Sequence, residues 1–281
     1  MTVNAMGKVR KYNWKFLMYF ILSIGAVTMI VPYIWMVTTA FKTFPETVAI
    51  PIQWLPSKFY LDNFREVLNR LNFAKYYVNT AVVTASITLL QALVCSMAAY
   101  GFARIKFPGS GWIFMVLLSM LMIPSQMTMI PTFILLSRFG WIDTFKALII
   151  PHFYSVYGTF FLRQFFLGIP RELEEAAIID GTSRFGIYLK IFVPLSGAAF
   201  AAFAIFTINW SWNDLMWPLI MTSRQSIRVL SVGIATLVGE HFTRNNWLMA
   251  AAMLATTPLI VIFIIFQKRF IEGVALTGIK A

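Results

Sequence analysis

The chain has 281 residues, of which 59% are hydrophobic and 12% charged, and its mean hydropathy is +0.74. An average soluble domain carries about twice this share of charged residues, so composition excludes an ordinary soluble protein and predicts a membrane protein. The net charge of +12 comes from Lys and Arg scattered between apolar runs, which favours contact with membrane lipid and argues against nucleic-acid binding.

The first apolar stretch follows a basic segment. Residues 16–41 carry no charge and are too long for the apolar core of a cleaved signal peptide, which has about 7–15 residues. We therefore predict a cytoplasmic N-terminus (residues 1–15), a first transmembrane helix (residues 16–41) and an extracytoplasmic loop (residues 42–75). Within the loop, "LDNFREVLNRL" predicts a short amphipathic helix. The basic residues that set this orientation are Lys8, Arg10, Lys11 and Lys15.

Further apolar stretches predict an all-α polytopic protein with six transmembrane helices, because about 20 apolar residues cross a bilayer. Residues 76–270 form the predicted transmembrane core, and residues 271–281 a cytoplasmic tail with little tendency to be helical. Prolines inside the stretches are expected to kink the helices without breaking them. The second stretch is rich in small residues and should pack centrally, whereas "LIVIFIIF" in the last should face lipid. The stretches after the first are residues 76–103, 107–137, 147–162, 191–213 and 246–267.

One cytoplasmic segment, residues 168–192, gathers acidic side chains that the rest of the chain lacks. "PRELEEAAIIDGTS" predicts a helix that starts with Pro170 in its first position and runs to about Asp180. Gly181 can adopt the left-handed conformation that ends a helix, and Thr182 or Ser183 can cap a second one. So short a helix is marginal alone, which predicts a docking surface. We expect Glu175 to meet a cation there, and Ala176 and Ala177 to offer a low surface to a groove.

The same segment resembles the EAA loop of bacterial ABC-importer permeases. "FFLGIPRELEEAAIIDG", "WSWNDLMWPL" and the tail "RFIEGVALTGIKA" are similar to the second permease subunit of maltose-type carbohydrate importers. Only Val193 departs from the motif, where Leu is usual. The residues expected to couple to the ATPase are Glu175, Ala176, Ala177, Asp180, Gly181, Ile191 and Pro194.

The resemblance implies a type I importer fold with a helix-turn-helix coupling loop. It also implies a second permease as heterodimer partner, two cytoplasmic ATPase subunits and an extracytoplasmic solute-binding protein. The tail would reach between the ATPases, although a frayed terminus explains it equally well.

The sequence contains no G-x-x-x-x-G-K-[ST] phosphate loop and no catalytic motif. We therefore expect a transport subunit, not an enzyme. No cofactor or metal is expected on this chain, and ATP and Mg would be bound by a partner ATPase. The alternative is a stand-alone secondary transporter or a membrane enzyme, but these should show mid-span charges or a catalytic cluster.

A candidate pathway lies in "NWSWNDLMWPL". Trp210, Asp214 and Trp217 follow i, i+4, i+7 spacing and should share a helix face, with Asn209 and Asn213 alongside. Aromatic rings beside amides and a carboxylate suit a sugar, which favours a polar pathway. An outer aromatic belt or plain packing remains the alternative. Other polar residues within the spans, including Asn79, Gln91 and His152, are expected to form interhelical hydrogen bonds.

Overall fold

The computed structural model describes residues 3–239 and 243–278, with side chains for residues 14–239 and 243–267, and all regular elements in these residues are helices. Two compact units make up the chain. The first combines the chain up to Leu71 with Thr236–Ala255, and the second combines Asn72–Ala235 with the chain from Thr256 onward. Helix α15 (Asn245–Gly278) therefore contributes to both units.

The first unit contains the long helix α1, and Pro32 lies inside it without breaking it, as predicted. Residues Trp14–Ala40 of α1 are long and apolar enough to cross a membrane. The predicted amphipathic helix is confirmed as α3. Its buried Asn63 links α3 to the end of α1, because Asn63 Nδ2 donates hydrogen bonds to the carbonyl oxygens of Ala40 (2.9 Å) and Lys42 (2.7 Å). The helices before α15 are α1 (Val3–Ala40), α2 (Phe44–Thr47) and α3 (Asp62–Arg70).

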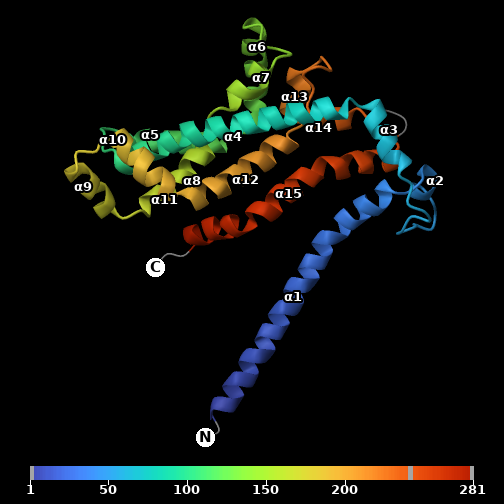
Figure 1. Cartoon of the computed structure of the whole chain (residues 1–281), viewed down its shortest axis with the longest axis horizontal. Helices are drawn as coiled ribbons and strands as arrows, with labels where there is room; N and C mark the ends of the chain where they lie inside the picture. Colours follow the sequence, from blue (N-terminus) through green and yellow to red (C-terminus); the bar gives the residue numbers. More distant parts are fainter. Residues whose placement is uncertain (1–2, 240–242, 279–281) are drawn as a thin grey trace. The chain divides into compact units, whose positions relative to one another are not determined.

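The second unit is built around α4 (Phe73–Arg104), which packs against α8 (Val156–Leu167) and α12 (Gly197–Asn213) (Figure 1). This confirms that the span rich in small residues packs centrally. Gly158 shows how closely these helices approach, because a Cβ added there would lie 2.6 Å from Cε2 of Phe203. Any side chain at this position would require the buried Phe203 ring to move.

The third predicted span is broken, not kinked. Its two halves meet at Pro124 with a bend of 96°. A residue before proline is pushed out of the helical region, and Ile123 accordingly has φ −85° and ψ 116°. The expectation that proline would only kink is therefore wrong at Pro124, although Pro131 does lie inside a helix. The elements are α5 (Ser110–Ser119), the 3₁₀ turn η1 (Met120–Met122) and α6 (Ser125–Arg138).

The fourth predicted span, residues 147–162, is also divided. A new helix, α8, starts after Ser155, whose extended backbone and side-chain oxygen cap it by accepting the Gly158 N–H at 3.1 Å. Twelve residues rise only about 18 Å, which is short of the hydrocarbon thickness. The divided segment before it is α7 (Phe145–Ile149) and the 3₁₀ turn η2 (Ile150–His152).

The fifth predicted span begins earlier than expected and contains a π-helical turn, η3 (Tyr188–Phe192). The helices around Ser196 are bent by 77°. Among the described residues, three helices are long and apolar enough to cross a membrane, or up to five if each bent pair counts as one. Exposed Ile264 and Ile265 agree with a lipid-facing last helix, and α15 continues through Gly273, where little helix was expected. The remaining elements of the second unit are α9 (Arg171–Ile179), α10 (Arg184–Ile187), α11 (Val193–Leu195), α13 (Met216–Met221) and α14 (Leu230–Ala235).

Candidate functional site

The acidic segment folds as two short helices joined at a glycine. Helix α9 (Arg171–Ile179) has Glu172 and Glu174 in its first turn. Gly181 has φ +76°, the left-handed conformation predicted for it. Ser183 caps the next helix, because its Oγ accepts the Gly186 N–H at 3.1 Å. Pro170 precedes the helix instead of occupying its first position, which corrects the prediction at that residue.

A buried ion-pair network anchors this segment to α4, and sequence reasoning did not find it. The Glu174 carboxylate accepts a hydrogen bond from the Arg184 guanidinium and lies 3.9 Å from Nη1 of Arg104. Arg104 also donates hydrogen bonds to the carbonyl oxygens of Phe166 (2.6 Å) and Ile169, at the end of α8. One guanidinium therefore holds the end of α4, the end of α8 and the start of α9 in a fixed arrangement. Arg104 and Glu174 are far apart in sequence, so no local pattern links them. The one available signal is that this chain has few charged residues, so that any charge buried in it is expected to be paired.

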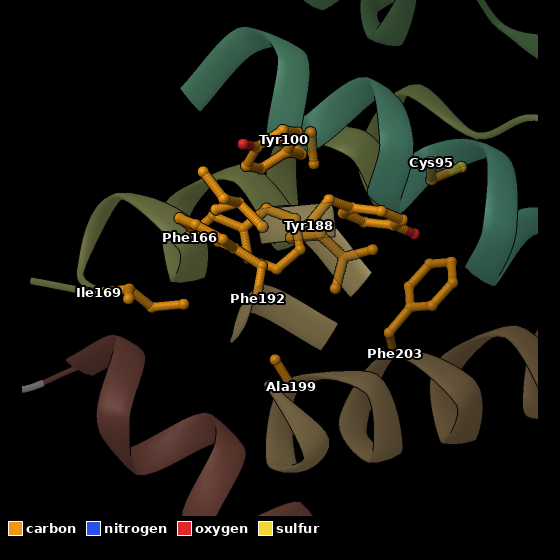
Figure 2. Close-up of a cluster of buried hydrophobic side chains, with 11 residues drawn as sticks. Cys95, Tyr100, Phe166, Ile169, Tyr188, Phe192, Ala199 and Phe203 are labelled. Carbon is orange, nitrogen blue, oxygen red and sulfur yellow. The ribbon is translucent and has the colours of Figure 1, made fainter. Parts of the chain in front are cut away.

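Beneath the network lies an apolar cluster that joins α4, α8 and the residues after Ser183 (Figure 2). The ring of Tyr100 packs against those of Tyr188 and Phe192, with centroids 5.5 and 4.9 Å apart. Ser96 Oγ and the Tyr188 hydroxyl oxygen are 2.7 Å apart, so the hydroxyl group of Tyr188 is hydrogen-bonded within the cluster. The base of the segment is thus a rigid part of the second unit.

The predicted coupling residues divide into an exposed and an inward-facing group. Ala177 and Ile191 are half-buried and pack against the cluster, so the expectation that Ala177 offers its surface to a groove is wrong. Ala177 faces inward because it lies three residues after Glu174, which is also buried. Gly181 is exposed at the joint, and Ile179 beside it is 85% exposed. The other exposed residues of the predicted set are Glu175, Ala176, Asp180 and Pro194.

The predicted pathway residues do not share one helix face. Helix α12 ends at Asn213, and Asp214 is extended with ψ 121°. Asp214 Oδ1 accepts the Trp217 N–H at 3.4 Å, which helps to start α13, and Pro218 fits in that helix's first turn because it needs no N–H there. The i, i+4, i+7 argument was therefore wrong, because a new helix begins inside the motif.

The fold nevertheless places Trp210 and Trp217 in contact with the same side chain, that of His152. The His152 ring lies edge-to-face against Trp210 and Trp217, with centroids 5.0 and 4.9 Å apart. Trp217 is buried and its Nε1 donates to the Ala147 carbonyl at 3.0 Å, so it serves as packing. Gln91 Nε2 donates to the His152 carbonyl at 2.7 Å, which confirms the interhelical role predicted for Gln91.

A cavity of about 500 Å³ lies beside this aromatic group. Asn209 and Trp210 line it, whereas Asp214 and Trp217 line a separate cleft of about 10 Å³, and Asn213 bonds back to the Asn209 carbonyl at 2.8 Å. His152 lines both spaces, and within the described part of the chain its buried Nε2 has no hydrogen-bond partner. The remaining polar residues that line the larger cavity are Gln91, Tyr154, Ser155, Tyr157 and Thr207.

Comparisons with known proteins agree with this architecture. Residues 91–275 match the model of the family described as "Binding-protein-dependent transport system inner membrane component". The arabinooligosaccharides transport system permease protein of Halalkalibacterium halodurans is 34% identical over 80% of this chain and 81% of its own length. The trehalose/maltose transport system permease protein of Thermococcus litoralis is 31% identical over 92% and 96%.

A solved structure shows the same fold. The crystal structure of a bacterial ABC transporter involved in the import of the acidic polysaccharide alginate contains a chain that aligns with a TM-score of 0.80 and 19% identity. The alignment covers 93% of this chain and 98% of that one. The chain therefore belongs to the family of binding-protein-dependent transport system inner membrane components, as an integral membrane permease subunit of an ABC importer.

Proposed function

We propose that this subunit imports a sugar or oligosaccharide and forms half of the pathway. The observation that carries the proposal is the 500 Å³ cavity beside Trp210 and Asn209, where His152 Nε2 is buried without a partner. An aromatic ring with amides and an imidazole can bind the apolar face and the hydroxyl groups of a sugar ring. The volume lies in the range of about 300–1,000 Å³ that small-molecule sites occupy. The names of the relatives support a carbohydrate substrate.

The cavity also bears on the aromatic-belt alternative. Trp217 is 8% exposed, so packing describes it better than a belt facing lipid. Trp210 is 47% exposed and lines the cavity, so it is the tryptophan that we assign to the pathway. Asp214 and Asn213 then support the helix ends and do not contact the substrate.

Our proposal for coupling places the exposed side of the α9 segment against a cytoplasmic ATPase. Glu175, Ala176, Asp180 and Gly181 present this side, and Ile179 adds apolar area. The network around Glu174 would pass a displacement of α9 directly to α4 and α8. The proposal includes cytoplasmic termini, six spans, a second permease, two ATPase subunits that bind ATP and Mg, and an extracytoplasmic binding protein.

Uptake by reconstituted complexes tests the pathway. Trp210→Ala should reduce sugar uptake per assembled complex at least about tenfold, because stacking on an aromatic ring is lost. Trp112→Ala, at a 74% exposed tryptophan outside the cavity, is the matched control and should transport normally. Normal uptake with Trp210→Ala would leave the aromatic belt as the better description.

A pull-down tests the coupling surface separately. Glu175→Lys should weaken binding of the ATPase or uncouple hydrolysis from uptake. Lys190→Glu, a charge reversal at an exposed residue of the same segment outside the motif, should have little effect. Equal ATPase binding and stimulation by wild type and Glu175→Lys would contradict the assignment.

A further inference from the structure

We propose that the first unit carries an accessory saccharide site, made by α3, the residues after α1 and the start of α15. The site is a pocket of about 610 Å³, comparable in size to known small-molecule sites. It belongs to a different compact unit from the cavity beside Trp210, and the proposal does not rest on that cavity. The residues that line the pocket are Thr43, Phe44, Pro45, Tyr60, Asp62, Asn63, Arg65, Glu66, Arg70, Arg244, Asn246 and Trp247.

A buried pair of amides defines the floor of the pocket. Asn63 is fully buried, and its Nδ2 is already used by two carbonyl oxygens, so its Oδ1 must act as an acceptor. Asn246 Nδ2 donates to that oxygen at 2.7 Å. This arrangement fixes the orientation of the Asn246 amide and leaves its Oδ1 as the free atom. Asn246 is 3% exposed, and its Oδ1 has no hydrogen-bond partner among the residues that the structure describes.

An unpartnered buried acceptor is costly, typically about 1–3 kcal/mol, and each one in a native protein needs an explanation. A ligand hydroxyl that donates to Asn246 Oδ1 supplies one. An anion cannot satisfy this atom, because carboxylates and phosphates act mainly as acceptors. The floor of the pocket therefore selects a group that can donate.

Charged and aromatic side chains surround the two buried amides at the floor of the pocket. The guanidinium groups of Arg70 and Arg244 each lie 4.3 Å from the centre of the Trp247 ring, which holds these cations at the pocket. Glu66 Oε2 accepts from Nε of Arg70 at 3.2 Å, and among the described side chains Arg244 forms no ion pair. The pocket thus offers guanidinium donors, carboxylate acceptors and an aromatic indole within one space.

A polyhydroxylated ring matches this combination. Its hydroxyls can donate to the Asn246 amide and to the carboxylates of Asp62 and Glu66, and they can accept from Arg244. The apolar edge of such a ring can contact Tyr60 or Trp247. We therefore assign a neutral monosaccharide unit as the ligand class, either a free sugar or one residue of an oligosaccharide.

The test uses the purified full-length chain in lipid nanodiscs and a fixed panel of glucose, galactose, arabinose and N-acetylglucosamine. Binding is measured by saturation-transfer NMR and calorimetry. At least one sugar should bind, and Arg244→Gln should weaken it about tenfold or more, since a hydrogen bond from a charged group is lost. Trp247→Leu should act in the same direction. Lys58→Gln and Trp54→Leu, exposed positions of the same unit outside the pocket, are matched controls.

All binding measurements are made in the Trp210→Ala background, so that the transport cavity beside Trp210 contributes as little sugar binding as possible and the signal reports the pocket of the first unit. Arg244 is exposed, so its substitution keeps the fold intact even if Trp247→Leu does not. The proposal is overturned if no sugar of the panel binds, or if Arg244→Gln binds as tightly as wild type. Binding of acetate or phosphate in place of every sugar would also overturn it, in favour of an anion site.

Discussion

Replacing Glu174 with Gln should loosen the α9 segment, and the structure indicates which ion-pair partner of Glu174 contributes most. The Arg104 side chain is 4% exposed and that of Glu174 10%, whereas the Arg184 side chain is 57% exposed. At 3.9 Å, an effective dielectric constant near 20 gives about 4 kcal/mol of Coulomb attraction between Glu174 and Arg104, before desolvation. Removing one partner of a buried pair costs about 3–5 kcal/mol. Because Arg104 keeps two carbonyl partners, we expect about 3 kcal/mol.

The exposed pair should contribute much less, although its atoms lie closer together. Because the Arg184 side chain is 57% exposed, solvent screens its attraction to the buried Glu174, and we expect about 1 kcal/mol, near the upper end of exposed ion pairs. A double-mutant cycle should therefore give a larger coupling energy for Glu174→Gln with Arg104→Gln than with Arg184→Gln. Reversible unfolding of the subunit by SDS in mixed micelles measures these free energies.

A matched control for that experiment is Glu172→Gln, because Glu172 is exposed on the same helix. We expect it to change the free energy of unfolding by less than about 0.5 kcal/mol. Equal stability of Glu174→Gln and wild type, or a larger coupling to Arg184 than to Arg104, would refute the argument from burial.

Other predictions concern the joint at Gly181, the two alanines of α9 and the loop that follows α1. Gly181→Val should cost about 1–2 kcal/mol in the left-handed region and reduce substrate-stimulated ATP hydrolysis, whereas Gly181→Asn should retain it. Ala177→Leu should destabilise the subunit by about 1–3 kcal/mol in the same SDS titration through overpacking, whereas Ala176→Leu should spare stability and weaken the ATPase pull-down. Hydrogen bonds from Ser57 and from the Thr43 N–H lower the pKa of Glu46 to about 2, so its stabilisation is present above its ordinary value of 4.5 and is lost as pH falls towards 2. Hydrogen exchange of residues 43–57 should show this acid loosening, and Glu46→Gln should abolish it.

Each of these predictions has a result that would contradict it. Equal activity of Gly181→Val and Gly181→Asn would show that the positive φ is not required for coupling. Greater destabilisation by Ala176→Leu than by Ala177→Leu would reverse the assignment of inward and outward faces. Acid loosening that persists in Glu46→Gln would place the titrating group elsewhere.

Features with a local physical cause could be predicted from the sequence. Gly181 and Ser183 were found because a left-handed turn and a helix cap each require particular residue types at one position. The central packing of α4 followed from its small residues, since they permit close approach in lipid. The family was recognisable because the spacing of the EAA motif lies within one continuous segment.

Features that depend on distant partners could not be predicted. Helical periodicity placed Trp210 and Trp217 on one face, but a new helix starts between them and their meeting point is His152, on another segment. The inward face of Ala177 depends on Glu174 reaching Arg104 at the end of α4. A single sequence does not contain these pairings, because many residues of the same types are equally available as partners.

The π-helical turn at Tyr188–Phe192 lies between the proposed coupling segment and helix α12. A π turn holds one residue more than an α turn, and each residue of an α-helix rotates the chain by about 100°. The extra residue is therefore absorbed in a widened turn, and the helices on either side stay nearly in phase. The same widened turn carries Tyr188 and Phe192, which both pack against Tyr100. A single-residue deletion within this turn should therefore be tolerated better than one in the regular helix α12, where it would rotate the following residues by about 100°.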